Sequence, residues 1–427
     1  MRNIRIFRYS CAFILLLSSC SSYALIGLND YGYGARSKSM GGTAVADPED
    51  ALASAANPAG ITELHTQAEF GLLVTSPRRG YEASNPGEFS PFAVAPGKYW
   101  SRKNYFFVPN MGFVSCLNQK WAYGIAMYGN GGLNTDYSPS TSQATIGASP
   151  GVYGGNATGI DLKQLFINLS LAWKANPNFS LGASLLPVLQ LFQAKGLSPF
   201  APFSIAPNEL SNQNTQSSKG FGIRIGGLAK LSPNLRIGAA YQPKIPMSKF
   251  SRYAGLFPNR GSFDIPSTAL VGLSYTPRSN LTLNMDIQKI WYSDIQALSN
   301  PNNCGPGAPC LGIHHGAGFG WNNPLALKLG VQWIFNELWT LRAGYAHLNQ
   351  TIPSDQGFFN ILAPVATTNQ YTLGFTKKIY PCVDFNFGTM YAPLVKVAGE
   401  NPFNPAQTIQ IFLRHYEFFG SLTWHFA

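Results

Sequence analysis

The connections between the strand-like segments of this chain alternate between very short and long. From about residue 66 onward, apolar and polar residues alternate with a period of two, as in LTLNMDIQKIW at 281–291. Six connections have two to four residues and seven are long, so together they join fourteen segments of about ten residues. Strands of that length can cross a bilayer at a tilt. The pattern predicts an all-β fold, a fourteen-stranded antiparallel transmembrane β-barrel with no unpaired backbone in lipid.

The composition favours the same fold over a soluble β-sandwich. Only 11% of the residues are charged and 13% are aromatic, and beyond the N-terminus no apolar stretch reaches the ~18 residues of a spanning helix. The last segment, HYEFFGSLTWHFA, alternates up to Phe426, which is typical of a closing barrel strand. It departs from the usual pattern because Ala427 follows Phe426. The expected barrel spans residues 66–427.

The N-terminus predicts export to the outer membrane of a Gram-negative cell. Residues 1–24 combine three arginines with the apolar run CAFILLLSSC, which is the pattern of a signal peptide. SYA at 22–24 fits cleavage after Ala24, and this is the favoured interpretation. LSSC at 17–20 also fits a lipobox, which would instead leave a lipidated Cys20 at the mature N-terminus.

The positive charge of the chain does not indicate nucleic-acid binding. Cleavage after Ala24 removes three arginines and lowers the formal charge from +11 to +8. Basic residues gather in three expected extracellular stretches, at 76–82, 97–104 and 248–261. In an exported barrel such stretches face lipopolysaccharide phosphates, so outer-membrane lipid and lipopolysaccharide are the expected polyanionic neighbours.

Four cysteines remain after cleavage. Cys304 and Cys310 lie close together in CGPGAPC, and an oxidising compartment favours a local disulfide between them. Cys116 and Cys382 belong to strands expected far apart in the barrel, and we expect both to be free. The spacing offers too few ligands for a metal site, and we expect no metal, nucleotide or covalent cofactor.

Residues 25–65 differ from the rest of the chain. They are rich in Gly, Ala and Ser and do not alternate. A segment of this length in front of the first strand can hang in the periplasm or fold back into the lumen. A fourteen-stranded barrel leaks unless it is filled, and small residues suit close backbone packing. We therefore expect a hatch inside the lumen, with Leu25 and Ile26 touching the ligand pocket.

The same segment resembles the FadL/TodX family of outer-membrane transporters for long-chain fatty acids and hydrophobic compounds. The resemblance rests on Gly34-Ala35-Arg36, on Gly41 to Asp47 (GGTAVAD) and on the triplet Asn57, Pro58, Ala59 before the first strand. A further similarity is WAYGI at 121–125 in the third strand. The resemblance covers the whole mature chain and is specific mainly in the hatch.

The resemblance implies passive transport without an energy-coupling site, and we expect the protein to be a monomer. A hydrophobic ligand is captured at apolar extracellular loops and moves into a pocket in the lumen. The hatch then shifts, and the ligand leaves sideways through a gap made by a kink in the third strand. Gly124, Gly129 and Gly131 suit such a kink. The sequence MYGNGGLN departs here from the family pattern, so the position of the gap stays open.

Two kinds of residue would bind an amphipathic acid. Arg224 and Lys328 have lumen parity in the upper half of the barrel and are the candidates for the carboxylate, because an unpaired ion in a dry pocket is costly. For the tail, residues 185–203 supply an apolar capture groove, worth ~0.8 kcal/mol per buried methylene. Residues 253–259 are expected to form a second wall. The groove residues are Leu189, Leu191, Phe192, Leu197, Phe200 and Phe203.

Four other functions are less consistent with the sequence, and one of them is a purely structural or adhesive barrel, whose loops should be polar. An aromatic-hydrocarbon importer of the same family differs only in its ligand. A general diffusion porin needs a polar, unplugged lumen, which the hatch and the apolar loops argue against. An enzyme is not expected, because the histidine–serine pairs nearest in sequence, His415 with Ser421 and His347 with Ser354, lie in no nucleophile motif.

Overall fold

The computed structural model describes residues 27–87, 92–139, 144, 146–147, 149–302 and 309–426. In this part of the chain fifteen strands form one sheet, and pairing of β15 with β1 closes it. The short β2 pairs only with the end of β1, so fourteen strands make up the barrel and the predicted fold is confirmed. The strands are β1 (Gln67–Ala83), β2 (Gly97–Trp100), β3 (Phe106–Cys116), β4 (Trp121–Asn134), β5 (Gly159–Asn176), β6 (Phe179–Lys195), β7 (Gln216–Ser232), β8 (Leu235–Gln242), β9 (Ser267–Arg278), β10 (Leu281–Trp291), β11 (Leu325–Ile334), β12 (Trp339–Leu348), β13 (Asn369–Tyr380), β14 (Val383–Asn401) and β15 (Asn404–His425).

The period-two pattern separates an apolar outer face from a polar lumen. On β10, Leu283 and Met285 are 42% and 39% exposed, whereas Asn284 and Asp286 are 5% and 1% exposed. The exposed apolar side chains face outward because successive residues of a strand point to opposite sides. No helix of the described residues is long and apolar enough to cross a membrane.

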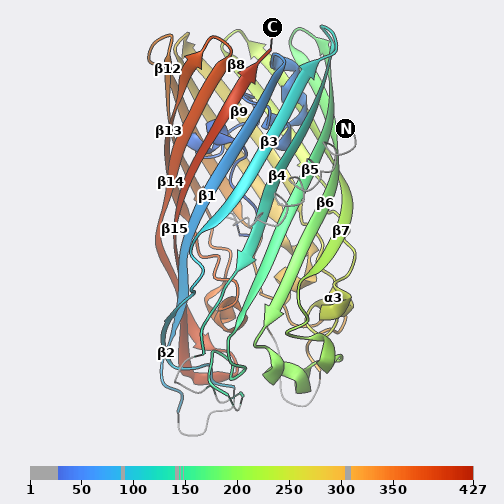
Figure 1. Cartoon of the computed structure of the whole chain (residues 1–427), viewed down its shortest axis with the longest axis vertical. Helices are drawn as coiled ribbons and strands as arrows, with labels where there is room; N and C mark the ends of the chain where they lie inside the picture. Colours follow the sequence, from blue (N-terminus) through green and yellow to red (C-terminus); the bar gives the residue numbers. More distant parts are fainter. Residues whose placement is uncertain are drawn as a thin grey trace, which may run out of the picture.

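The short turns gather at one end of the barrel and the long loops at the other (Figure 1). Several strands continue beyond the bilayer into the loop end. β1 pairs with β15 in unbroken register from Gln67↔His425 to Ala83↔Ile409, so the stretch 76–82, expected in a loop, is strand. The expected loop boundary was wrong there because two strands can keep pairing above the membrane.

The loop end has its own apolar core. It is built from short helices that pack together with the upper strand ends, and Phe192, Phe250 and Phe358 are among its fully buried side chains. The helices of this end are η3 (Ser198–Phe203), η4 (Pro207–Glu209), η5 (Ser251–Tyr253), α3 (Pro258–Gly261), η6 (Tyr292–Asp294), α4 (Gln296–Ser299), η7 (Ser354–Gln356) and α5 (Gly357–Asn360).

Residues 27–65, here called the hatch segment, lie inside the barrel toward the short-turn end (Figure 1). The segment contains α2 (Ala35–Ser39), η1 (Ala53–Ala55) and η2 (Pro58–Glu63). α2 contacts β12 to β15, and η2 contacts β4 to β7 on the other side of the lumen. Gly42 has φ +86°, and a Cβ there would lie 2.0 Å from the Tyr31 carbonyl oxygen, so this turn requires glycine. The small residues therefore permit the close packing expected from the sequence.

Candidate functional site

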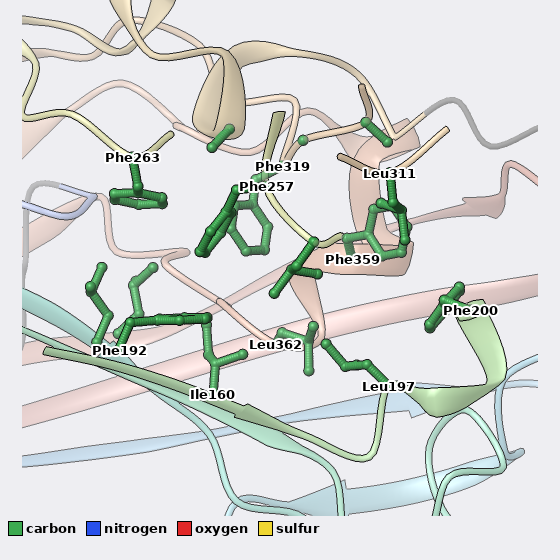
Figure 2. Close-up of a pocket in the computed structure, with 16 residues that line it drawn as sticks. Ile160, Phe192, Leu197, Phe200, Phe257, Phe263, Leu311, Phe319, Phe359 and Leu362 are labelled. Atoms are coloured by element: carbon green, nitrogen blue, oxygen red, sulfur yellow. The ribbon is translucent and has the colours of Figure 1, made fainter. Parts of the chain in front are cut away.

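An apolar pocket lies among the loops and the strand ends at the loop end of the barrel (Figure 2). It contains about 590 Å³ of space not filled by atoms, part of it open to solvent. The lining residues are Leu133, Ile160, Leu162, Phe192, Leu197, Phe200, Leu256, Phe257, Phe263, Ala297, Leu311, Ala317, Gly318, Phe319, Phe359 and Leu362. The lining is apolar throughout, so the pocket suits a hydrophobic ligand.

Segments far apart in the sequence build this pocket. Ile160 and Phe192 come from the lumen faces of β5 and β6, and Phe257 comes from the loop that follows β8. The Phe192 ring lies 4.8 Å from the Phe257 ring and 4.9 Å from the Tyr253 ring. Aromatic pairs at such distances stabilise one another beyond their area burial. The pocket wall is therefore preformed by ring packing rather than by strand pairing alone.

The structure brings only part of the expected capture groove to the pocket. Phe192, Leu197 and Phe200 line it, together with Leu256 and Phe257 of the expected second wall. Leu189 and Leu191 do not, because β6 continues to Lys195 and its alternation turns them outward. Phe203 also lies away from the lining, where its ring packs 5.3 Å from Phe92. The prediction that the whole groove faces the ligand was therefore wrong for Leu189, Leu191 and Phe203.

Arg224 and Lys328 are buried lumen residues, but neither lines the pocket. Arg224 donates to the Ala55 carbonyl oxygen of the hatch segment and, at 2.7 Å, to Gln242 Oε1. Lys328 Nζ donates to the Tyr31 carbonyl oxygen at 2.5 Å. Arg224 pairs with Ser184 of β6, eight residues from Phe192, or roughly 26 Å along the strand. The expected placing of the two cations beside the tail pocket is therefore corrected: both hold the hatch segment.

The triplet Asn57, Pro58, Ala59 fixes the hatch segment to the wall. Asn57 Nδ2 donates to the Val45 carbonyl oxygen at 2.8 Å and to the Gly227 carbonyl oxygen at 2.9 Å. Its Oδ1 accepts from Ala59 N at 3.1 Å and caps η2. The side chain therefore ties two parts of the hatch segment to β7 with one amide.

Ion pairs add a second set of links between the hatch segment and the wall. Acids of the hatch segment meet basic wall residues, and its own bases meet wall acids. Burial raises the pKa of Glu63, but hydrogen bonds from Lys230 and Lys174 outweigh it and hold that pKa below its ordinary value. The pairs are Asp47–Arg236, Glu49–Arg342, Glu63–Lys174, Glu63–Lys230, Arg36–Asp384 and Lys38–Glu417.

The strand pairing of the barrel wall is interrupted between β3 and β4. Because β2 lies outside the barrel, β4 is its third strand. Their register stops at Met111↔Met127, and residues 128–134 of β4 continue along β5 without β3 (Figure 1). A bulge between Gly129 and Gly131 leaves Asn130 as an extra residue, which bends the strand. Gly124, in contrast, lies in regular pairing, so the kink begins five residues later than that residue. We call the interruption the β3–β4 gap.

The gap is bounded above by side chains and behind by the hatch segment. Arg79 Nε donates to the Asn134 carbonyl oxygen at 2.5 Å and its Nη1 to the Lys103 carbonyl oxygen at 2.9 Å. On the lumen side, Asp30 N donates to the Asn130 carbonyl oxygen at 2.6 Å, and Tyr33 Oη donates to Asn130 Oδ1 at 2.6 Å. The bulge therefore contacts the hatch segment directly, so a shift of one disturbs the other.

Several expected features fall outside the described residues. These are the signal peptide with Ala24 and Cys20, and the hatch residues Leu25 and Ile26. Cys310 is disulfide-bonded, but Cys304 also lies outside the described part, so their pairing stays a prediction. Cys116 and Cys382 are free and exposed.

Sequence reasoning missed the far side of the pocket. Leu311, Phe319, Phe359 and Leu362 line it from two loops that carry no strand pattern. Their apolar character inside long extracellular loops, as in GFFNIL at 357–362, was the available signal. Leu133 was missed because the extra residue at the bulge reverses the alternation of β4 and turns this side chain toward the pocket.

Comparison with known proteins agrees with this architecture. A family model described as outer membrane protein transport protein (OMPP1/FadL/TodX) matches residues 14–409. The long-chain fatty acid transport protein of Salmonella typhi is 23% identical over 402 residues, covering 82% of this chain and 83% of that protein. Outer membrane protein P1 of Haemophilus influenzae is 24% identical over 359 residues, covering 76% and 72%.

Solved structures show the same fold. The toluene transporter TodX of P. putida aligns with a TM-score of 0.65 at 17% identity, covering 93% of this chain and 99% of TodX. A Pseudomonas aeruginosa FadL homologue aligns with a TM-score of 0.67 at 16% identity, covering 94% and 100%. The expected family and location are confirmed: the chain belongs to the OMPP1/FadL/TodX family of outer-membrane transport proteins.

Proposed function

We propose that the protein passively transports long-chain fatty acids or related hydrophobic compounds across the outer membrane. The observation that carries this proposal is the apolar pocket, with its wholly apolar lining and its preformed aromatic wall. The named relatives, a long-chain fatty acid transport protein and a toluene transporter, support a hydrophobic ligand. We also propose that the protein is not an enzyme.

Capture begins at the loop end, where the exposed part of the pocket meets the medium. An apolar chain gains ~0.8 kcal/mol for each methylene that leaves water. Phe192, Leu197 and Phe200 form the near wall of this capture site, and Phe257 and Leu256 the second wall. Leu189, Leu191 and Phe203 take no part.

Exit occurs sideways through the β3–β4 gap. Leu133 lines the pocket and belongs to the β4 stretch that has left β3, so the pocket reaches the gap. The hatch segment contacts Asn130 from the lumen side and acts as the gate. A shift of Asp30 and Tyr33 away from Asn130 opens the route into the membrane.

A carboxylate meets Arg224 and Lys328 only after the hatch segment moves. In the resting arrangement both cations donate to hatch carbonyl oxygens. Once those carbonyls withdraw, two buried cations are left without these acceptors, which is costly unless an anion replaces them. The two residues therefore favour the shifted state when the ligand is an acid, and a neutral hydrocarbon gains nothing from them.

Binding to purified protein in detergent tests the pocket. A long-chain fatty acid and a neutral aromatic hydrocarbon are each titrated into the wild type, Phe192→Ser and the matched control Leu191→Ser, whose side chain points outward. Phe192→Ser is expected to weaken the binding of both ligands by about tenfold or more, since a buried Phe contributes ~1.5–3 kcal/mol. Equal affinities of Phe192→Ser and Leu191→Ser would contradict the proposal.

Arg224→Ala and Lys328→Ala separate the two ligand classes. Fatty-acid uptake is expected to fall relative to hydrocarbon uptake in both variants, because loosening the hatch segment acts on both ligands whereas only the acid loses its cation. If neither ligand responds, the aromatic-hydrocarbon importer becomes the better interpretation. If the wild type binds neither ligand and conducts ions steadily in a planar bilayer, the general diffusion porin replaces both.

Two further features complete the proposal. We propose that the protein acts as a monomer. The basic residues at the loop end associate with lipopolysaccharide, as the positive stretches near 97–104 and 248–261 suggest.

A further inference from the structure

Two arginines face each other on the outer surface of β1 and β15. Arg78 and Arg414 are direct partners in the β1–β15 register, and both have outward parity. Direct partners have Cβ atoms about 4.5–5.5 Å apart, and like charges in this position destabilise the pair. Among the described residues, no carboxylate forms an ion pair with either arginine. Their arrangement therefore favours an anion from outside the chain.

The two arginines lie in a groove with aromatic walls. The groove has about 940 Å³ of unfilled space, part of it open solvent. The Arg78 guanidinium lies 6.0 Å from the Tyr105 ring, and the Arg414 guanidinium lies 5.5 Å from the Tyr416 ring. Contact with ring faces orients both cations before any ligand arrives. The groove is lined by Ser76, Arg78, Trp100, Tyr105, Arg414, Tyr416 and Phe418.

The groove lies at the outer boundary of the bilayer. Arg78 is eleven residues from the first residue of β1, or ~36 Å along the strand. A strand tilt of about 35–45° converts this to roughly 26–30 Å along the membrane normal, against an apolar band ~25 Å tall. Tyr416 stacks on Tyr391 at 5.1 Å, as in the aromatic girdle of a barrel. The arginines are therefore at the level of the headgroups of the outer leaflet.

Two further lysines lie near the pair, and one of them is already paired with a carboxylate. Lys396 is exposed and is the cross-strand partner of Phe412, next to Arg414 on β15. Lys98 of β2 lies 5.5 Å from the Phe412 ring. Glu82 also points outward and lies four residues after Arg78 on β1. It pairs with Lys98 at 3.7 Å and forms no ion pair with either arginine among the described residues. The charge of this surface is complementary to a phosphorylated headgroup.

We propose that the groove between Arg78 and Arg414 binds the phosphate of a phosphorylated glycolipid of the outer leaflet, the class to which lipopolysaccharide belongs. Two guanidinium groups suit one phosphate, because each can donate two parallel hydrogen bonds. The aromatic wall below them, with Phe418 deepest in the bilayer, packs against the first part of an acyl chain. This site rests on the proposed lipopolysaccharide association and is independent of ligand transport through the lumen.

Lipid A carrying its phosphates is the probe, titrated into the full-length protein in detergent with dephosphorylated lipid A and phosphatidylglycerol in parallel. The test variant is Arg78→Gln with Arg414→Gln. The matched control is Arg278→Gln with Lys120→Gln, which removes two exposed positive charges at the short-turn end. Fatty-acid binding in the lumen pocket, unchanged in the test variant, shows that the barrel is folded.

The test variant is expected to bind lipid A about tenfold or more weakly than wild type, and the control to change less than about twofold. Dephosphorylated lipid A is expected to bind wild type as weakly as lipid A binds the test variant. If the test variant and the control variant bound lipid A equally well, the site at Arg78 and Arg414 would be overturned, while the association of the protein with lipopolysaccharide would stand. Equal binding of phosphatidylglycerol, or of dephosphorylated lipid A, by wild type would overturn the glycolipid phosphate. No binding by wild type would overturn the association itself.

Discussion

Replacing Gly182 with alanine is expected to loosen the hatch segment from the barrel wall. A Cβ at Gly182 would lie 2.4 Å from both Ala59 N and the Pro58 carbonyl carbon, whereas 3.4–4 Å is an ordinary contact. The wall cannot yield easily, because Gly182 is paired on both sides, with Ala172 and with Gly226. The overlap of about 1 Å must therefore displace η2.

The magnitude follows from the size of the overlap. An extra methyl group in a well-packed site costs ~1–3 kcal/mol. If that cost falls on the docked state alone, the population of the displaced hatch rises about 5- to 150-fold. Gly227→Ala is the matched control, since its Cβ would meet nothing closer than Leu181 Cδ2 at 3.7 Å. Both changes add the same methyl group to a strand, so their effect on the unfolded chain cancels.

Ion conductance across a planar bilayer measures the displaced state, because the docked hatch segment fills the lumen. Gly182→Ala is expected to open more often than wild type, and Gly227→Ala to behave as wild type. The reasoning would be refuted if both variants opened at the same frequency. Resistance of the barrel to heat in detergent, equal in the two variants, shows that the wall itself is intact.

Three other outcomes follow from the same contacts. Asn57→Ala removes three hydrogen bonds and leaves the Val45 and Gly227 carbonyls without this donor, so the free energy of hatch docking should fall by about 1–3 kcal/mol or more, seen as more frequent conductance openings than in wild type. Because its pKa is lowered, ionised Glu63 stabilises docking fully at pH values above its ordinary pKa of 4.5, and this contribution is lost as the pH falls through the lowered pKa. Openings of the wild type should therefore become more frequent on acidification. Openings of Glu63→Gln should already be frequent at neutral pH and should rise less on acidification. Deletion of Asn130 removes the bulge of β4, so it should reduce the uptake of hydrophobic ligand by cells. Ligand binding to the pocket in detergent should stay within about twofold of wild type. Loss of binding would show that the bulge shapes the pocket instead.

The barrel was predictable because its constraints are local. Alternation along each strand and the lengths of the connections are read directly from neighbouring residues, and they determine a closed sheet in a bilayer. Strand ends were less predictable. β6 runs through Leu189 and Leu191 to Lys195 because its partners keep hydrogen bonding above the membrane, and this long-range pairing leaves no local signal.

The site was predictable only in part, for the same physical reason. Parity correctly assigned Arg224 and Lys328 to the lumen, but their acceptors are carbonyls of the hatch segment, 169 and 297 residues away in sequence. Hydrogen bonds to backbone carry no side-chain signature, so sequence alone favoured a ligand carboxylate. The kink of β4 was expected from its glycines, whereas its inserted residue, Asn130, is identified by the register with β5.

The central claim is that a hydrophobic ligand occupies the pocket between the loops and the hatch segment. A long-chain fatty acid with a photoactivated group near its tail end, irradiated in complex with the protein and mapped by mass spectrometry of the peptides, tests it most directly. The account predicts crosslinks in residues 256–263, 317–319 and 359–362, which Phe192→Ser reduces and Leu191→Ser does not. Crosslinks confined to the outward face of the barrel, or unchanged in Phe192→Ser, would contradict it.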